Sequence, residues 1–78
     1  MKRRYEISAN GLLGPRLTRI SSADVLNEYG LNIDIEIISE EHGEYFDVFK
    51  VSVKSSSKTI KSFISLMNKK GYRVSLVY

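Results

Sequence analysis

The sequence has no cysteine, no tryptophan, one proline and one histidine among its 78 residues. The missing cysteines exclude disulfides and thiolate metal sites, and one histidine, His42, is too few for the usual zinc ligand sets. The chain also lacks an apolar run long enough for a signal peptide or a membrane span. These absences predict a cytoplasmic domain that binds no metal, carries no cofactor and does not enter a membrane.

Residue patterns of the common enzyme classes are missing as well. The five glycines are too scattered for a Walker phosphate loop or a dinucleotide-binding fingerprint. A serine nucleophile needs a neighbouring base, and His42 adjoins Gly43 in a polar turn instead. We therefore expect a protein that is not an enzyme and has no catalytic residues, with His42 as a solvated turn residue.

Length and composition indicate one globular domain over residues 1–78. At 8.9 kDa the chain is too short for two cores, and its 42% of hydrophobic residues is enough for one. A core of this size gives a margin of only roughly 3–5 kcal/mol against unfolding. Self-association would add to that margin.

The charged residues are segregated along the chain. Residues 1–23 carry five bases and one acid, residues 24–47 carry eight acids and no base, and residues 48–78 carry seven bases and no acid. A purely acidic block repels phosphate, so this pattern suits self-association or a protein partner better than a nucleic acid. Acids and bases that lie side by side in the fold would explain the same pattern without any partner.

Apolar and polar residues alternate in four segments, which are predicted to be strands: Arg3–Ala9, Leu31–Ser39, Tyr45–Lys54 and Tyr72–Tyr78. The turn at His42–Glu44 joins the second and third strands into a hairpin, and Gly43 is expected to supply a positive φ there. When both apolar faces are directed inward, Lys50 is expected opposite Asp34 or Glu36.

Two helices are predicted between these strands. Three serines at 55–57 offer an N-cap for the second helix, whose apolar residues have the spacing of one helix face: Ile60, Phe63, Ile64 and Met67. Apolar residues between Pro15 and Tyr29 fall on two faces, so one straight helix is not expected there. Ser21–Asp24 predicts a shorter helix that starts at this point and ends at Gly30, while helix, loop and extended hairpin stay open for Leu12–Ser21.

Strand, helix, strand, strand, helix, strand is the order of the α+β ferredoxin-like fold, a βαββαβ sandwich. Right-handed connections place the strands in the spatial order fourth, first, third, second. We therefore predict a four-stranded antiparallel sheet with both helices on one face.

Three short stretches stand at the boundaries of these elements. They are Gly14-Pro15-Arg16-Leu17 with Ile20 downstream, Gly30-Leu31-Asn32-Ile33, and Gly71-Tyr72-Arg73-Val74 before the last strand. The first is similar to the Pro-Gly-Leu-Leu stretch and following Ile of the ACT family of small regulatory domains, and the second to its Gly-x-Asn-Ile. With these stretches the chain resembles an ACT-like domain.

The resemblance implies a non-enzymatic regulatory module that forms a homodimer and binds an amino acid or a similar small ligand. It places the ligand at the first strand–helix loop and the second strand, with contacts at Asn10, Gly11, Leu13, Gly14 and Asn32. In this interpretation backbone N–H groups of the loop bind a carboxylate, and a second subunit excludes water.

Two other functions stay open from the sequence. A protein-binding adaptor or inhibitor would use the apolar residues on the outer side of the hairpin, Ile38, Phe46 and Val48. A weak RNA binder would contact phosphate through Arg3, Arg4, Lys54, Lys58, Lys61 and Arg73. Nucleic acid is the less favoured partner, because the outer side of the first strand presents charged and small residues rather than aromatic rings.

Overall fold

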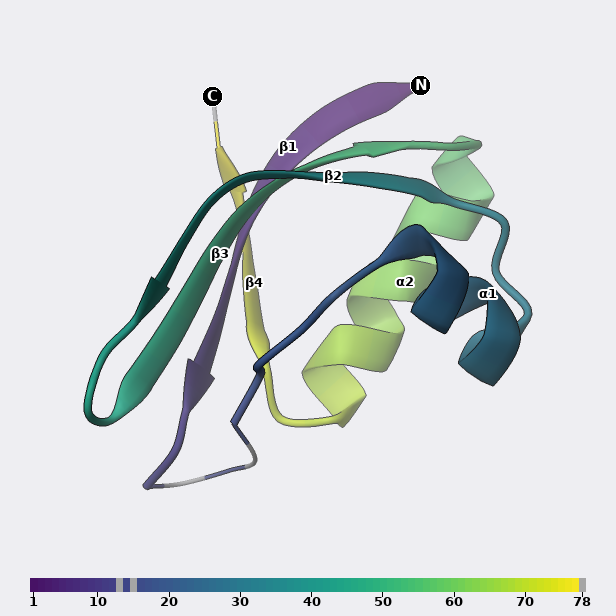
Figure 1. Ribbon diagram of the computed structural model, residues 1–78. Helices are drawn as coiled ribbons and strands as arrows, with labels where there is room; N and C mark the ends of the chain where they lie inside the picture. Colours follow the sequence, from purple (N-terminus) through teal and green to yellow (C-terminus); the bar gives the residue numbers. More distant parts are fainter. Residues whose placement is uncertain (13, 15, 78) are drawn as a thin grey trace.

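The computed structural model describes residues 1–12, 14 and 16–77. Within them four strands and two helices follow one another in the predicted α+β ferredoxin-like order (Figure 1). The elements are β1 (Lys2–Asn10), α1 (Ser22–Tyr29), β2 (Asp34–His42), β3 (Phe46–Lys54), α2 (Ser57–Lys69) and β4 (Arg73–Val77). All neighbouring strands are antiparallel, in the order β2-β3-β1-β4, which confirms the predicted arrangement.

The core lies between the two central strands and the helix layer. Alternate residues of β1 and β3 are buried on the side of the sheet that faces the helices, and one face of α2 packs on them (Figure 1). These residues are Tyr5, Ile7, Ala9, Phe49, Val51, Val53, Ile60, Phe63 and Met67. The inward faces predicted for the first and third strands and the second helix are therefore confirmed.

Local capping signals set the limits of the helices. Ser21 is the N-cap of α1, where its hydroxyl accepts the N–H of Asp24 at 3.2 Å, and Gly30 ends this helix with φ 69°. Ser56 is the N-cap of α2. The short first helix is confirmed, residues 16–20 are not helical, and Pro15 lies outside the described residues.

The register of β2 departs from the prediction. The strand begins at Asp34, three residues later than expected, and a bulge between Ile37 and Ser39 shifts its pairing with β3. Lys50 lies opposite Ser39, so the expected position opposite Asp34 or Glu36 is wrong. A bulge places two residues of one strand against one residue of its partner, and simple alternation does not reveal it.

The hairpin tip also differs from the expectation. Positive φ values among the described glycines occur only at Gly30 and Gly71, so the positive φ expected at Gly43 is wrong. Gly43 instead donates its N–H to the carbonyl oxygen of Phe46 at 2.6 Å. A Cβ at this position would lie 3.3 Å from that oxygen, so a close backbone approach explains the glycine.

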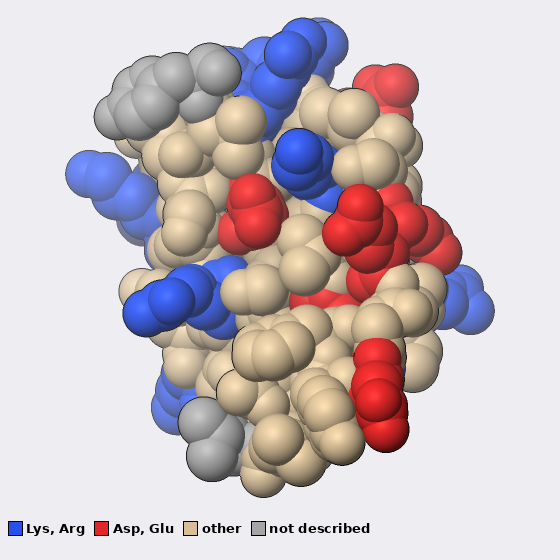
Figure 2. Space-filling model, turned by 90° about the vertical axis from the view of Figure 1, so that its left-hand side faces the viewer, with Lys and Arg blue, Asp and Glu red and all other residues tan. Residues whose placement is uncertain are grey.

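Neither helix of the described residues covers the second side of the sheet, which we term the free face. It consists of Phe46, Val48, Lys50, Ser52 and Lys54 of β3 with their cross-strand partners on the other three strands. Figure 2 shows acidic side chains mainly along one edge of this face and basic ones mainly along the other. Among the helices of the described residues, neither has the length and apolar character needed to cross a bilayer.

Candidate ligand pocket

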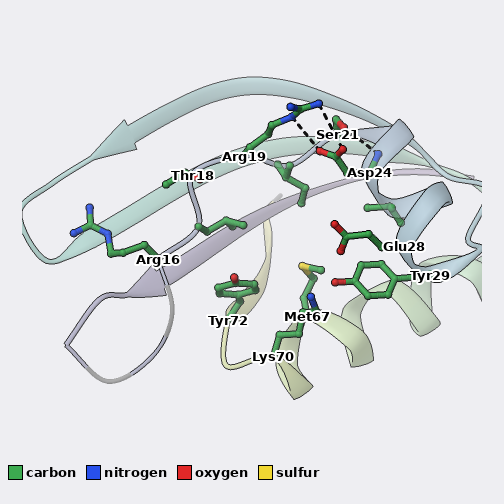
Figure 3. Close-up of a pocket in the computed structure, with 13 residues that line it drawn as sticks. Arg16, Thr18, Arg19, Ser21, Asp24, Glu28, Tyr29, Met67, Lys70 and Tyr72 are labelled. Carbon is green, nitrogen blue, oxygen red and sulfur yellow. Dashed lines mark hydrogen bonds and ion pairs between the residues drawn. The ribbon is translucent and has the colours of Figure 1, made fainter.

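A pocket of about 260 Å³ opens on the helix side of the molecule, away from the free face. It is enclosed by the extended segment 16–21, by α1, and by the turn that joins α2 to β4 (Figure 3). Two parts of the chain that are distant in sequence, residues 16–29 and residues 67–72, therefore meet around one cavity.

The inner wall of the pocket is apolar and its rim is polar. Leu17, Ile20, Val25 and Met67 line the wall, and all four are buried. The rim carries two acids, two bases and two tyrosines, namely Asp24, Glu28, Arg19, Lys70, Tyr29 and Tyr72. An apolar wall with a few converging polar groups is the usual character of a small-molecule site.

The charged rim residues differ in the contacts that they already make within the protein. Arg19 and Asp24 form an ion pair, with 3.0 Å between Nε and Oδ2. The Lys70 ammonium lies 4.6 Å from the centroid of the Tyr29 ring, an arrangement in which the cation keeps its charge for a further partner. Glu28 forms no ion pair within the described residues, and in Figure 3 its carboxylate points toward the open centre.

A tight helix end places Lys70 and Tyr72 at the rim. Gly71 has φ 97° and donates its N–H to the carbonyl of Asn68 at 3.0 Å. Tyr72 donates to the carbonyl of Met67, also at 3.0 Å. These two bonds form the Schellman motif, which ends α2 and turns the chain back across the pocket.

A buried carboxylate fixes the segment that forms one wall of the pocket. The side chain of Asp47 is only 1% exposed, and it accepts hydrogen bonds from Arg16 Nε at 2.7 Å and Arg16 Nη2 at 2.9 Å. The N–H of Leu17 donates to it at 3.2 Å, and His42 Nδ1 lies 2.7 Å from its Oδ1. We term these four residues the Asp47 network.

Arg16 extends this network to the tip of the hairpin. It donates to the carbonyl oxygens of Gly43 and Glu44, both at 2.8 Å. A side chain on Gly11 would collide with the Arg16 side chain, so a glycine is needed there. The Asp47 network thus ties Arg16 and Leu17 to the β2–β3 hairpin, across about 30 residues of sequence.

The same contacts change the ionisation of the network. Hydrogen bonds from Arg16 and then His42 hold the pKa of Asp47 well below its usual range. Hydrogen bonds to Asp47 and then Glu40 raise the pKa of His42 above its ordinary value of 6.5. His42 is exposed to solvent, as expected, but it is the last residue of β2 rather than a turn residue, and its ring also contacts a buried carboxylate.

The raised pKa of His42 predicts a pH dependence of stability. Its contribution is complete below about pH 6.5, the pKa of an unfolded histidine, and is lost as the pH rises through the higher folded value. We expect the thermal unfolding midpoint to fall as the pH rises above about 6.5, and His42→Gln to remove most of this fall. The lowered pKa of Asp47 leaves its own contribution constant over this range, since it is lost only below about pH 4.

Thermal unfolding of the wild type and of His42→Gln at several pH values measures how steeply the midpoint falls with pH. The same slope in both proteins would show that a group other than His42 titrates.

The ligand residues expected at the first loop lie together near the hairpin tip. Asn10 Oδ1 accepts the N–H of Leu12 at 2.9 Å, Gly14 donates to the carbonyl of Asn10, and Gly11 donates to the carbonyl of Tyr45. These three amides already have acceptors within the protein, so a ligand there would compete with them. Leu13 lies outside the described residues.

Asn32, expected at the same site, lies at the other end of the sheet. It stands two residues before Asp34, which pairs with Lys54, while Asn10 pairs with Phe46 at the opposite end of β3. Its carbonyl accepts the hydroxyl of Ser55. Within one chain, the structure does not bring Asn32 together with the first loop.

The expected partner residues are accessible. Ile38 at the bulge and Phe46 are each 52% exposed, and Val48 is half-buried on the free face. The candidate phosphate-binding residues are more dispersed. Arg4 and Arg73 lie on different rows of the free face, whereas Lys58 and Lys61 lie on α2.

Sequence reasoning missed the Asp47 network and most of the pocket rim. One signal was available, because Asp47 has the same alternation as the inward residues Phe49, Val51 and Val53. A carboxylate on the buried side of a strand requires a partner. Nothing in the local sequence identifies Arg16 as that partner, and nothing brings Glu28 and Lys70 to one rim.

Comparisons with known proteins identify no relative. No protein-family model, no curated protein and no solved structure matches this chain. The ACT-like resemblance therefore stays a prediction, and the pocket itself carries the functional argument.

Proposed function

We propose that this protein is a small non-enzymatic regulatory module that binds a free amino acid or a similar zwitterion in the pocket beside α1. The observation that carries this proposal is the pair of opposite charges, Lys70 and Glu28, on the rim of one cavity of about 260 Å³. An amino acid combines opposite charges with a short side chain, and this rim and wall offer a partner for each part.

The pocket suggests how such a ligand would lie. Its carboxylate would approach Lys70, its ammonium group would approach Glu28, and its side chain would contact the apolar wall at Val25 and Met67. Pockets for drug-sized ligands have about 300–1,000 Å³, so this smaller cavity suits a smaller molecule. Tyr29 and Tyr72 add hydroxyl groups that can donate to the carboxylate.

Rigidity of the wall also supports binding. The segment 16–21 has no helix or strand of its own, and the Asp47 network holds its first two residues in place. A wall that is ordered before binding lowers the entropic cost of binding. The proposed pocket does not include the first-loop residues that the ACT-like resemblance implied. Its lining begins at Arg16, just after that loop.

Thermal unfolding in the presence of each free amino acid tests the proposal. A ligand at about 100 times its Kd stabilises by about 2.7 kcal/mol, which raises the midpoint of a domain this small by roughly 10 °C or more. We expect a shift with one amino acid or a chemically similar group of them. Because the site binds by both charges and apolar contact, the shift should persist in high salt.

Two pairs of variants locate the site. Lys70→Met and Glu28→Gln each remove one charge-assisted contact and should weaken binding about tenfold or more. Lys69→Met and Glu41→Gln remove the same charges outside the pocket and should bind as the wild type does. Equal binding by Lys70→Met and Lys69→Met would contradict the proposal. A shift seen only with a short single-stranded RNA and lost in salt would indicate phosphate binding instead.

A further inference from the structure

An open groove lies at the end of the sheet where β1 begins and β4 ends. It has a volume of about 460 Å³ and is lined by Lys2, Arg3, Arg4, Leu76 and Val77. We term it the β1–β4 groove. Three of its five lining residues are basic and none is acidic, while the other two are apolar. This lining suits a ligand that combines negative charge with an apolar or flat group.

The free face continues this positive charge beyond the groove. Lys54 of β3 lies directly opposite Lys2 of β1, and Lys50 lies on the same side of β3. Figure 2 shows basic side chains gathered at this upper end of the face. Residues directly opposite each other in antiparallel strands have Cβ atoms about 5 Å apart, so like charges there repel. An anion bound between the two lysines would remove this repulsion.

The basic residues at this end form no ion pairs within the described part of the chain. Three acids nevertheless border them on the free face, namely Glu6, Asp34 and Glu36. Asp34 and Glu36 lie on the edge strand β2, on the side away from the groove. The positive charge is therefore strongest over the beginning of β1 and the β1–β4 groove, and an anion would lie there rather than over β2.

A buried hydroxyl group lies among these basic residues. Ser52 is only 6% exposed, and its Oγ has no hydrogen-bond partner among the residues that the structure describes. It belongs to the free face, where it lies opposite Arg4 and stands between Lys50 and Lys54 along β3. A buried hydroxyl without a partner is unfavourable, and an oxyanion that reached it would accept its hydrogen bond. The hydroxyl is thus a second, independent indication of an anion site.

We propose that this end of the free face, together with the β1–β4 groove, binds single-stranded nucleic acid. The phosphates would lie over the pairs that Lys2 and Arg4 form with β3, and an unpaired nucleobase would enter the groove beside Leu76 and Val77. Arginine guanidinium planes stack on nucleobases as aromatic rings do, so Arg3 and Arg4 can replace the rings that the outer side of β1 lacks. A duplex keeps its bases stacked inside and offers none to the groove.

The spread of the charges favours a chain of nucleotides over a single one. Lys50 and Lys54 are four residues apart on β3, which is about 13 Å along a strand, and the groove lies beyond β1. A free mononucleotide would contact only part of this surface, so affinity should rise with the number of nucleotides. Of the basic residues that the sequence suggested for phosphate, Lys58, Lys61 and Arg73 do not line the groove.

Fluorescence anisotropy of the full chain with a labelled oligouridylate of about six nucleotides tests the proposal. Binding should weaken as salt is added, with a slope of about −0.7 in log K against log salt for each phosphate contacted. Arg4→Met and Lys54→Met should each weaken binding about fivefold or more and reduce the size of this slope by about 1. Arg73→Met, at the other end of β4, and Lys61→Met, on α2, are the matched controls and should bind as the wild type does.

Ser52→Ala separates binding from folding. It should weaken binding about threefold or more, while the unfolding midpoint without nucleic acid stays the same or rises, because the hydroxyl has no partner to lose. Three results would each overturn the proposal: equal binding by Arg4→Met and Arg73→Met, a uridine monophosphate that binds as tightly as the oligonucleotide, or a hexaglutamate peptide that competes equally well. None of these measurements involves an amino-acid ligand, so their outcome is independent of the pocket beside α1.

Discussion

Asp47→Asn is expected to lower the thermal unfolding midpoint by roughly 10 °C or more, since breaking a pair that involves a buried carboxylate is strongly destabilising. The substitution keeps the shape of the side chain and removes its charge. Arg16 and His42 then lose the carboxylate that both of them contact. Because Leu17 also donates to this side chain, the wall of the pocket loosens at the same time.

An exposed aspartate of the same sheet provides the control. Asp34 lies opposite Lys54 on the edge strand β2 and is exposed, so Asp34→Asn should change the midpoint by less than about 2 °C. Arg16→Met tests the pairing further. In the double variant that combines it with Asp47→Asn, the loss of stability should be much smaller than the sum of the losses in the two single variants. Additive effects would mean that Arg16 and Asp47 act independently.

Phe63→Ala is expected to leave the chain largely unfolded at 25 °C. The Phe63 side chain is completely buried at the centre of the apolar face of α2. Truncation of a buried phenylalanine costs about 3–5 kcal/mol, and a domain of this size has roughly that margin in total. Circular dichroism at 25 °C and a urea titration measure the loss.

Phe63→Leu distinguishes lost volume from a general sensitivity of the helix. Leucine keeps most of the apolar volume, so this variant should stay folded with a loss of about 1 kcal/mol. A Phe63→Ala protein that unfolds cooperatively near the wild-type midpoint would show that the core closes the cavity. The estimate of a thin stability margin would then be wrong.

Much of the fold could be predicted because the signals are local. The spacing of Ile60, Phe63 and Met67 sets the buried face of α2, and Ser21 with Gly30 sets the limits of α1. Strand order follows from these elements and the right-handed connection rule. Each of these inferences needs only neighbouring residues and general chain geometry.

The parts that could not be predicted depend on contacts across the fold. The bulge near Ile38 changes the register of β2 without altering the apolar pattern in an obvious way. Arg16 and Asp47 are 31 residues apart in sequence, and only the folded sheet brings them together. The same holds for Glu28 and Lys70, whose helices must pack before the two residues share a rim.

The most direct test of amino-acid binding in the pocket is a ¹H–¹⁵N NMR titration of the full chain with the free amino acids. We expect an amino acid that raises the unfolding midpoint also to shift amide signals of residues 18–21, 28–29 and 70–72, around the pocket. Lys70→Met should reduce these shifts, and Lys69→Met should not. A weak ligand has a Kd of about 1 mM, so each amino acid is added to about 100 times that concentration. If no amino acid then changes the spectrum, or if the shifted signals belong to the free face, the proposal of an amino-acid site in this pocket is wrong.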